Sequence, residues 1–185
     1  MPPRNPRSPL QQKGRQAFGA LASQWRGLPL ESQIGWDIAA EAHGTGLSGY
    51  HYYMKLNAAR THLALSRLEL PPTAKPSIPT NPVGEAVVEG SGESLRIKLP
   101  VPSAPAEHTL VEATSPVSRG VRSIQAYRYV GLLPAPVDGY SDITDLLVRR
   151  FGELIPGTAI FIRIRQQIDG WMDVGKISRV VIPAG

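Results

Sequence analysis

The sequence predicts an α+β protein of two domains, a small three-helix bundle followed by an antiparallel β-sandwich with one short inserted helix. Three observations indicate this division. Apolar residues recur at helical spacing up to about residue 69, five prolines fall within residues 70–82, and from residue 83 the apolar period changes to two. We therefore expect a helical domain at 11–69, a semi-rigid linker at 70–82 and a β domain at 83–185.

The first 26 residues carry five of the twenty basic residues and none of the fifteen acidic ones, so the whole net charge of +5 lies there. Four prolines within residues 1–10 remove amide donors and predict an extended basic arm. We expect this region to bind a negatively charged partner, either an acidic protein surface or nucleic acid. The partner-binding residues would be Arg4, Arg7, Lys13, Arg15 and Arg26. The alternative is a disordered solubilising tail.

Three helices are expected in the first domain. The first begins near Gln11 and closes at Leu28, and the third is capped by Ser48 and continues from Gly49 to Leu68. The second begins near Pro29, and one mostly apolar side of it is expected to carry Ile34, Trp36, Ile38, Ala39 and Ala42.

Part of this helical region resembles known proteins. Trp25-Arg26-Gly27-Leu28, Trp36, Ala39-Ala40 and the run from Ser48 to Asn57 are similar to a segment of uncharacterised phage and prophage proteins. The same residues resemble a permuted HMG-box hairpin, in which an aromatic-rich helix packs on a tryptophan-bearing helix. The HMG resemblance implies docking on DNA. The alternative is that the aromatic rings only fill the core.

Strict alternation at Leu95–Leu99 marks the clearest strand of the second domain. Further strands are expected at 86–89, 109–113, 124–133, 158–168 and 176–182. Residues 143–151 follow helical spacing instead, after an Asp142 cap, and predict the inserted helix.

Residues 83–183 resemble a fibronectin type III or immunoglobulin-like domain. The resemblance rests on Phe161-Ile162-Arg163-Ile164-Arg165, then Asp169-Gly170 and Gly175-Lys176-Ile177-Ser178, which are similar to the last two strands of that family and the turn between them. It implies a spacer or adhesion module. Arg149-Arg150 and the alternating Arg163 and Arg165 are the basic features of this domain, and we expect either a solvated face or an interface with an acidic partner.

The sequence predicts no catalytic residues, cofactor or metal site. Its four histidines lack metal-ligand spacing, cysteine is absent, and neither a nucleophile motif nor a phosphate-binding loop occurs. No apolar run is long enough for a membrane span, and no signal-peptide core is found, so we expect synthesis in a cytoplasm.

These features together predict a non-enzymatic structural or assembly protein, a subunit of a phage or phage-derived particle such as its capsid, collar or tail. The arm and helices would bind neighbouring subunits, either further copies of the chain in a homo-oligomer or other virion proteins. One alternative is a nucleic-acid-associated protein that binds DNA through the arm and the HMG-like helices. Another is a surface or adhesion protein.

Overall fold

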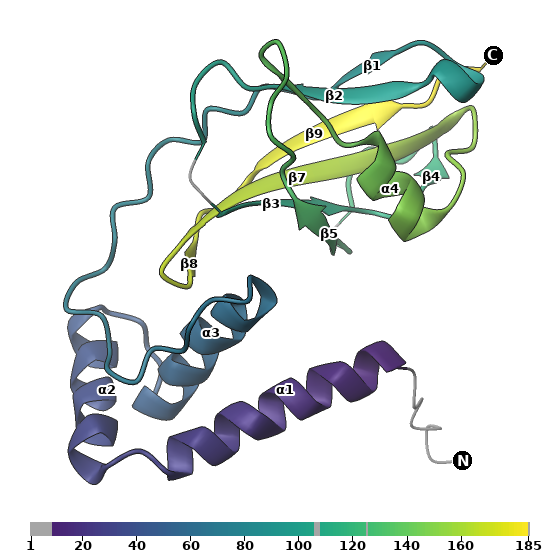
Figure 1. Ribbon diagram of the computed structural model, residues 1–185. Coiled ribbons are helices and arrows are strands. Elements are labelled where there is room, and N and C mark those ends of the chain that lie inside the picture. The colour runs from purple at the N-terminus through teal and green to yellow at the C-terminus, as the bar shows by residue number, and fades with distance from the viewer. Residues whose placement is uncertain (1–8, 106–107, 125, 185) are drawn as a thin grey trace. The chain divides into compact units, whose positions relative to one another are not determined.

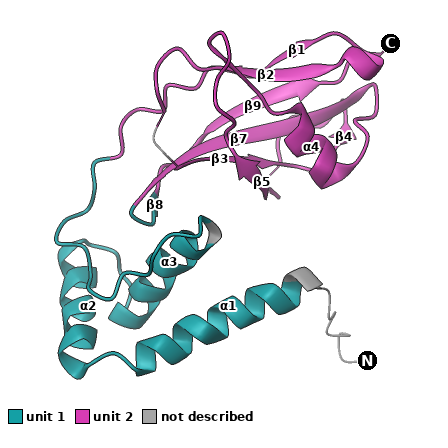
Figure 2. Cartoon of the chain, in the orientation of Figure 1, with its two compact units in different colours: residues 1–77, 169–171 teal, residues 78–168, 172–185 magenta. Residues whose placement is uncertain are grey.

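The computed structural model describes residues 9–105, 108–124 and 126–184, which form four α-helices, one 3-10 turn and nine strands (Figure 1). They belong to two compact units. Unit 1 comprises residues 1–77 with 169–171, and unit 2 comprises residues 78–168 with 172–185 (Figure 2). Unit 1 contains three of the helices and unit 2 contains the sheets, so the protein is of mixed α+β class.

Unit 1 is built around its third helix. The helices are α1 (Pro9–Arg26), α2 (Leu30–Ala42) and α3 (Gly49–His62), and both α1 and α2 pack on α3. Tyr52 and Tyr53 of α3 are fully buried, as is Trp36 of α2. Large rings dominate the energetics of so small a core because each removes more apolar area from water than an aliphatic side chain does.

Two helix ends differ from the expected positions. α1 begins at Pro9, so Pro9 and Leu10 are helical rather than extended, because proline is tolerated in the first turn of a helix. α3 ends at His62 rather than Leu68, and Ala64 follows with a positive φ of 54°. The chain then turns back, so that Leu68 lies beside Asn57. The Ser48 cap is confirmed, since its side chain accepts a hydrogen bond from the backbone N–H of His51 at 3.3 Å.

Unit 2 contains two antiparallel sheets. The first has the order β1-β2-β6, from β1 (Val87–Glu89), β2 (Arg96–Pro100) and β6 (Tyr140–Asp142). The second has the order β4-β7-β3-β5, and β8 and β9 also pair with β7. The strands of this sheet are β3 (His108–Ala113), β4 (Val117–Ser118), β5 (Arg128–Leu132), β7 (Thr158–Ile168), β8 (Trp171–Met172) and β9 (Lys176–Val181). Trp171 of β8 belongs to unit 1.

The core of unit 2 takes side chains from both sheets. Ile97 and Leu99 come from β2, and alternate residues of β7 join them, namely Ile160, Ile162 and Ile164. Because side chains alternate across a strand, Phe161, Arg163 and Arg165 point to the other side of β7. The unit is therefore sandwich-like.

The inserted helix is confirmed as α4 (Thr144–Phe151), which lies between β6 and β7 in the chain. It begins one residue later than expected, with Ile143 at the N-cap position, and Asp142 Oδ1 accepts from the backbone N–H of Thr144 at 2.9 Å. Leu147 is buried in the core of unit 2. The expected strand at 124–133 is shorter in the structure, where β5 covers only Arg128–Leu132.

Candidate interaction site

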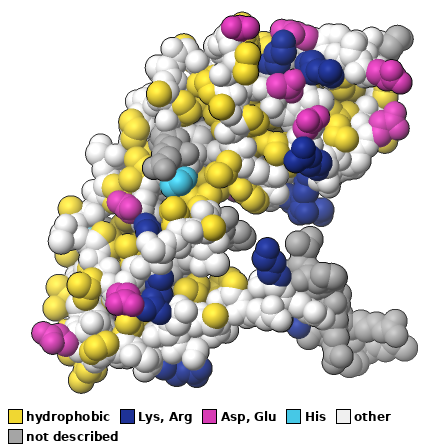
Figure 3. All heavy atoms as spheres, in the orientation of Figure 1, with side chains coloured by type: hydrophobic (Ala, Val, Ile, Leu, Met, Phe, Trp, Pro, Cys, Tyr) yellow, Lys and Arg dark blue, Asp and Glu magenta, His cyan; other side chains and the backbone are white. Residues whose placement is uncertain are grey.

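Helix α2 exposes a row of large aliphatic side chains. Leu30, Ile34 and Ile38 are 71%, 49% and 63% exposed, and their spacing of four residues aligns them along one side of the helix. We call these three residues the α2 outer face. Figure 3 shows hydrophobic side chains on the surface over α2 with acidic side chains among them.

The expectation that Ile34 and Ile38 share an apolar side with Trp36 is wrong. Residues two apart on a helix point in directions about 200° apart, so burial of Trp36 turns both isoleucines toward solvent. The spacing of residues 30, 34 and 38 was the signal in the sequence for this surface. The expected apolar side joins Ile34 and Ile38 to Trp36 and does not include Leu30, so it does not reveal this surface.

Contacts on the inner side of α2 fix which side faces solvent. Trp36 Nε1 donates a hydrogen bond to the carbonyl oxygen of Glu69 at 3.1 Å. Its ring centroid lies 5.6 Å from that of Tyr52 and 5.3 Å from that of Tyr53, with edge-to-face geometry in both pairs. Rotation of α2 would break this buried hydrogen bond and both ring contacts.

Two further side chains of α2, Gln33 and Asp37, hydrogen-bond to the backbone of neighbouring segments. At its start, Gln33 Nε2 donates to the carbonyl oxygens of Trp25 and Leu28, at 3.2 and 3.1 Å, and so fixes the α1–α2 corner. On the other side, Asp37 Oδ1 accepts from the backbone N–H of Gly49 at 2.6 Å. A Cβ atom at Gly49 would lie only 2.5 Å from the backbone nitrogen of Asp37, so the close approach of α2 and α3 requires glycine.

Helix α1 packs on its own unit through its second half. Leu21 is buried, and Trp25 places its ring centroid 5.7 Å from that of Tyr50 and 5.2 Å from that of Tyr53. Every residue from 11 to 16 is exposed, and Phe18 is 58% exposed. Packing of an apolar face supplies most helical stability in proteins. The first half of α1 therefore gains little stability from apolar packing within unit 1.

The exposed charges of the two helices are opposite in sign. α2 carries three exposed acidic residues and no basic one: Glu31, Asp37 and Glu41. α1 carries three exposed basic residues and no acidic one: Lys13, Arg15 and Arg26. Unit 1 therefore presents a basic helix, α1, and an acidic helix, α2. The exposed surface of α2 also carries the aliphatic row.

The structure places the expected binding residues as follows. Lys13, Arg15 and Arg26 lie on α1, whereas Arg4 and Arg7 lie outside the described residues. Arg149 and Arg150 are exposed in the last turn of α4.

Arg163 and Arg165 are engaged within unit 2. Arg163 Nε lies 2.6 Å from Glu112 Oε2, and its guanidinium carbon lies 4.2 Å from the ring centroid of Tyr127. Arg165 Nε donates to the carbonyl oxygen of Asp173 at 2.9 Å. These neighbours leave both arginines half-buried, and less available to a partner than the exposed charges of α1.

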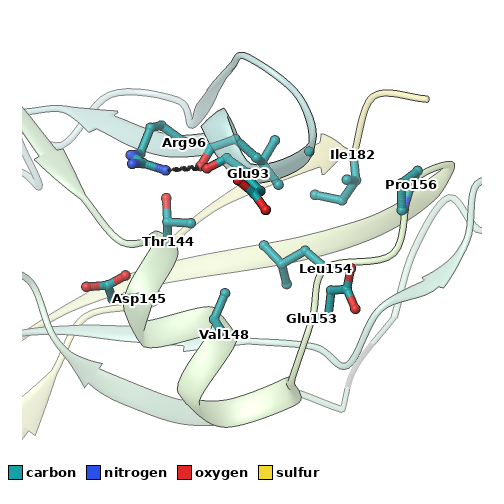
Figure 4. Close-up of a pocket in the computed structure, with 11 residues that line it drawn as sticks. Glu93, Arg96, Thr144, Asp145, Val148, Glu153, Leu154, Pro156 and Ile182 are labelled. Carbon is teal, nitrogen blue, oxygen red and sulfur yellow. Dashed lines mark hydrogen bonds between the residues drawn. The ribbon is translucent and has the colours of Figure 1, made fainter. Parts of the chain in front are cut away.

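Unit 2 also has a shallow pocket of about 360 Å³ between the 3-10 turn Gly92–Ser94 and α4 (Figure 4). Arg96 projects beside it, with Nη1 donating to the carbonyl oxygen of Glu93 at 3.4 Å and Nε lying 3.7 Å from Asp142 Oδ2. Asp145 and Glu153 are the other charged residues of its lining. The lining contains no histidine or cysteine, and no cluster of metal-ligating side chains occurs among the described residues.

A polar contact inside unit 1 joins a histidine to the aromatic core. His43 Nδ1 lies 2.7 Å from the hydroxyl oxygen of Tyr52, whose ring centroid is 5.7 Å from that of Trp171. Burial raises the pKa of Tyr52 from 10.0 to about 12, because the charged phenolate would be poorly solvated there. The contact joins His43, which follows the last residue of α2, to the aromatic core of unit 1.

None of the helices in the described part of the chain has the length and apolar character needed to cross a bilayer. Comparison of the chain with protein-family models, curated proteins and solved structures gives no match. Among the described residues, the α2 outer face aligns three exposed aliphatic side chains along one helix.

Proposed function

We propose that this chain is a non-enzymatic structural or assembly protein, a subunit of a phage or phage-derived particle, whose helical unit binds neighbouring subunits. The α2 outer face carries the proposal. Complete burial of one large aliphatic side chain stabilises a protein by about 1.5–3 kcal/mol. Leu30, Ile34 and Ile38 are each about half exposed or more in the single chain, so burial against a partner would add to stability. Exposed apolar surface of this kind, bordered by charge, is typical of protein interfaces.

The solvent-exposed first half of α1 supports the same proposal, since an exposed helix surface can pack against a neighbour. The assignment to a phage or phage-derived particle rests on the resemblance of residues 25–57 to phage and prophage proteins. Residence in a capsid, collar or tail follows from that assignment.

We infer that unit 2 is a fibronectin type III or immunoglobulin-like module that projects from the particle or joins its parts. Strand order supports this inference. With β1, β2, β3, β5, β6, β7 and β9 taken as strands A, B, C, C′, E, F and G, the sheets are A-B-E and C′-C-F-G. Immunoglobulin-like sandwiches place C, F and G together, and A, B and E together, in the same way. Helix α4 then occupies the E–F connection.

Association with particles tests the proposed function. Tagged full-length chain is expressed in the source cells, and nuclease-treated particles are separated on a density gradient. We expect the wild-type chain to sediment with the particles. The triple variant Leu30→Gln, Ile34→Gln, Ile38→Gln should remain in the soluble fractions, because it removes the apolar row and leaves the inner side of α2 intact.

The matched control is Val174→Gln, which replaces a 93% exposed valine of unit 2 and should not alter sedimentation. Circular dichroism of the purified triple variant checks that its helices form. Wild-type chain found only in the soluble fractions would contradict the proposal, as would a folded triple variant that still sediments with the particles.

A nucleic-acid-associated function is the second candidate, and the uniformly basic α1 favours it. It predicts binding to random-sequence duplex DNA that weakens steeply as salt is raised, and that is lost when Lys13, Arg15 and Arg26 are changed to glutamine. Fluorescence anisotropy measures this directly. Our main proposal predicts instead that loss of these charges affects subunit association.

A further inference from the structure

We infer that the α2 outer face binds α1 of a second copy of this chain, an inference that rests on the proposed assembly function. The exposed surfaces of the two helices are complementary. One is basic with an exposed aromatic ring, and the other is acidic with an exposed aliphatic row.

One side of α1 combines Phe18 with two arginines. Arg15 lies three residues before Phe18 and Arg26 lies eight residues after it, and a helical period of 3.6 residues places all three within an arc of about 80°. All three side chains are exposed. Both arginines lie on the flank of Phe18 that is turned away from Leu21 and Trp25, so α1 presents an exposed ring bordered by positive charge on that flank.

The exposed side of α2 has the corresponding arrangement with the opposite sign. Glu31 lies three residues before Ile34 and Glu41 lies seven residues after it, again on the side of the helix that faces solvent. Leu30 and Ile38 lie one turn to either side of Ile34. An aromatic ring seated over Ile34 would contact all three members of the α2 outer face.

The spacings select one orientation. At a rise of 1.5 Å per residue, Arg15 lies about 4.5 Å before Phe18 and Arg26 about 12 Å after it. Glu31 lies about 4.5 Å before Ile34 and Glu41 about 10.5 Å after it. With the helices parallel and Phe18 opposite Ile34, Arg26 of one copy lies at the level of Glu41 of the other and on the same flank of the contact, whereas Arg15 and Glu31 lie on opposite flanks. In the antiparallel orientation, Arg15 would be offset from Glu41 by about 6 Å along the axis, and Arg26 would be offset from Glu31 by about 7.5 Å.

Helix dipoles add to this preference. Glu41 lies in the last turn of α2, which contains no basic residue, and a negative charge is unfavourable at that end of a helix. A guanidinium from a second copy would offset this local repulsion. Arg26 in the last turn of α1 is the group that the parallel orientation brings there.

Other occupants fit the surface less well. The α1 of the same chain cannot turn onto the outer side of α2, because the Gln33 hydrogen bonds and the packing of Trp25 hold the corner between them. An anionic membrane or nucleic acid would be repelled by the three carboxylates on α2. A second copy supplies a basic helix with the required spacing. Each copy then uses its α1 to bind the α2 outer face of one neighbour and binds α1 of another copy through its own α2. Such contacts form a closed dimer or ring when the rotation that relates successive copies closes.

Charge reversal with mixing tests the pairing of Arg26 with Glu41. We expect sedimentation velocity to show an oligomer for the wild-type chain and a dissociation constant raised about tenfold or more for Arg26→Glu and for Glu41→Arg, each measured alone. An equimolar mixture of the two variants should restore the oligomer. In the mixture, the α1 helix that carries Arg26→Glu meets the α2 helix that carries Glu41→Arg, and the remaining contact keeps the wild-type pair.

The matched control is Arg122→Glu, which reverses an exposed charge in unit 2 and should leave the oligomer unchanged. A mixture that stays as dissociated as its components overturns the pairing, as do single variants that assemble like the wild-type chain. If that happens while the α2 triple variant still fails to join particles, the proposed function stands with a different protein on the α2 outer face. If the wild-type chain never joins particles, the proposed function itself is contradicted.

Discussion

A single buried amide, Asn57, determines how the chain leaves the helical unit. Its Nδ2 donates to the carbonyl oxygens of Tyr53 and Leu68, each at 3.2 Å, and its Oδ1 accepts from the backbone N–H of Leu68 at 2.8 Å. The side chain is 1% exposed, so no water replaces these partners. The sequence shows Asn57 as one more residue of a helical pattern, because nothing in the local pattern reveals a partner eleven residues away.

Substitution Asn57→Ala should destabilise the protein by about 1–3 kcal/mol, because it removes a buried amide and leaves the partly buried N–H and carbonyl groups of Leu68 without this partner. Urea unfolding followed by circular dichroism measures the change. Gln24→Ala, an exposed substitution on α1, should alter the free energy of unfolding by less than about 0.5 kcal/mol. Equal stability of Asn57→Ala and the wild-type chain would contradict the role assigned to this amide.

At the scale of elements, the sequence predicts regular structure where one period extends over many residues. The strand expected at Thr158–Ile168, between turn residues, is confirmed as β7 with the same bounds. The two-residue strands β4 and β8 were not predicted, because so short a segment has no measurable period. α2 was recognised as a helix, but the side that faces the core was not, since packing of Trp36 against α3 decides it.

The contact between α2 and α3 depends on Gly49. Substitution Gly49→Ala would place a methyl group against the backbone of Asp37, and we expect a loss of about 1–3 kcal/mol of stability. Gly19→Ala is the matched change, since a Cβ at Gly19 has nothing within 4 Å, and it should raise the helical content of α1 with a gain of up to about 1 kcal/mol. Thermal unfolding compares the two variants, and a neutral Gly49→Ala would show that α2 can shift away from α3.

For the whole molecule, composition and charge predict more about function than any single motif does. The sequence indicates a helical region, a proline-rich linker, a β region and a basic N-terminal segment, and from these an assembly protein is expected. The surface that carries the proposal was not predicted from the sequence. Leu30, Ile34 and Ile38 resemble core residues in a linear pattern, and only the packing of Trp36 on the opposite side of α2 shows that they face solvent.

The most direct test of assembly through the helical unit is sedimentation equilibrium of the purified full chain over a range of concentrations. We compare the wild-type chain with the double variant Ile34→Asp, Ile38→Asp and with the control Val174→Asp. The account predicts that the average mass of the wild-type and control chains rises above 20.0 kDa with concentration, whereas the double variant stays at that mass. A wild-type chain that remains at 20.0 kDa at every concentration would contradict self-assembly through the α2 outer face.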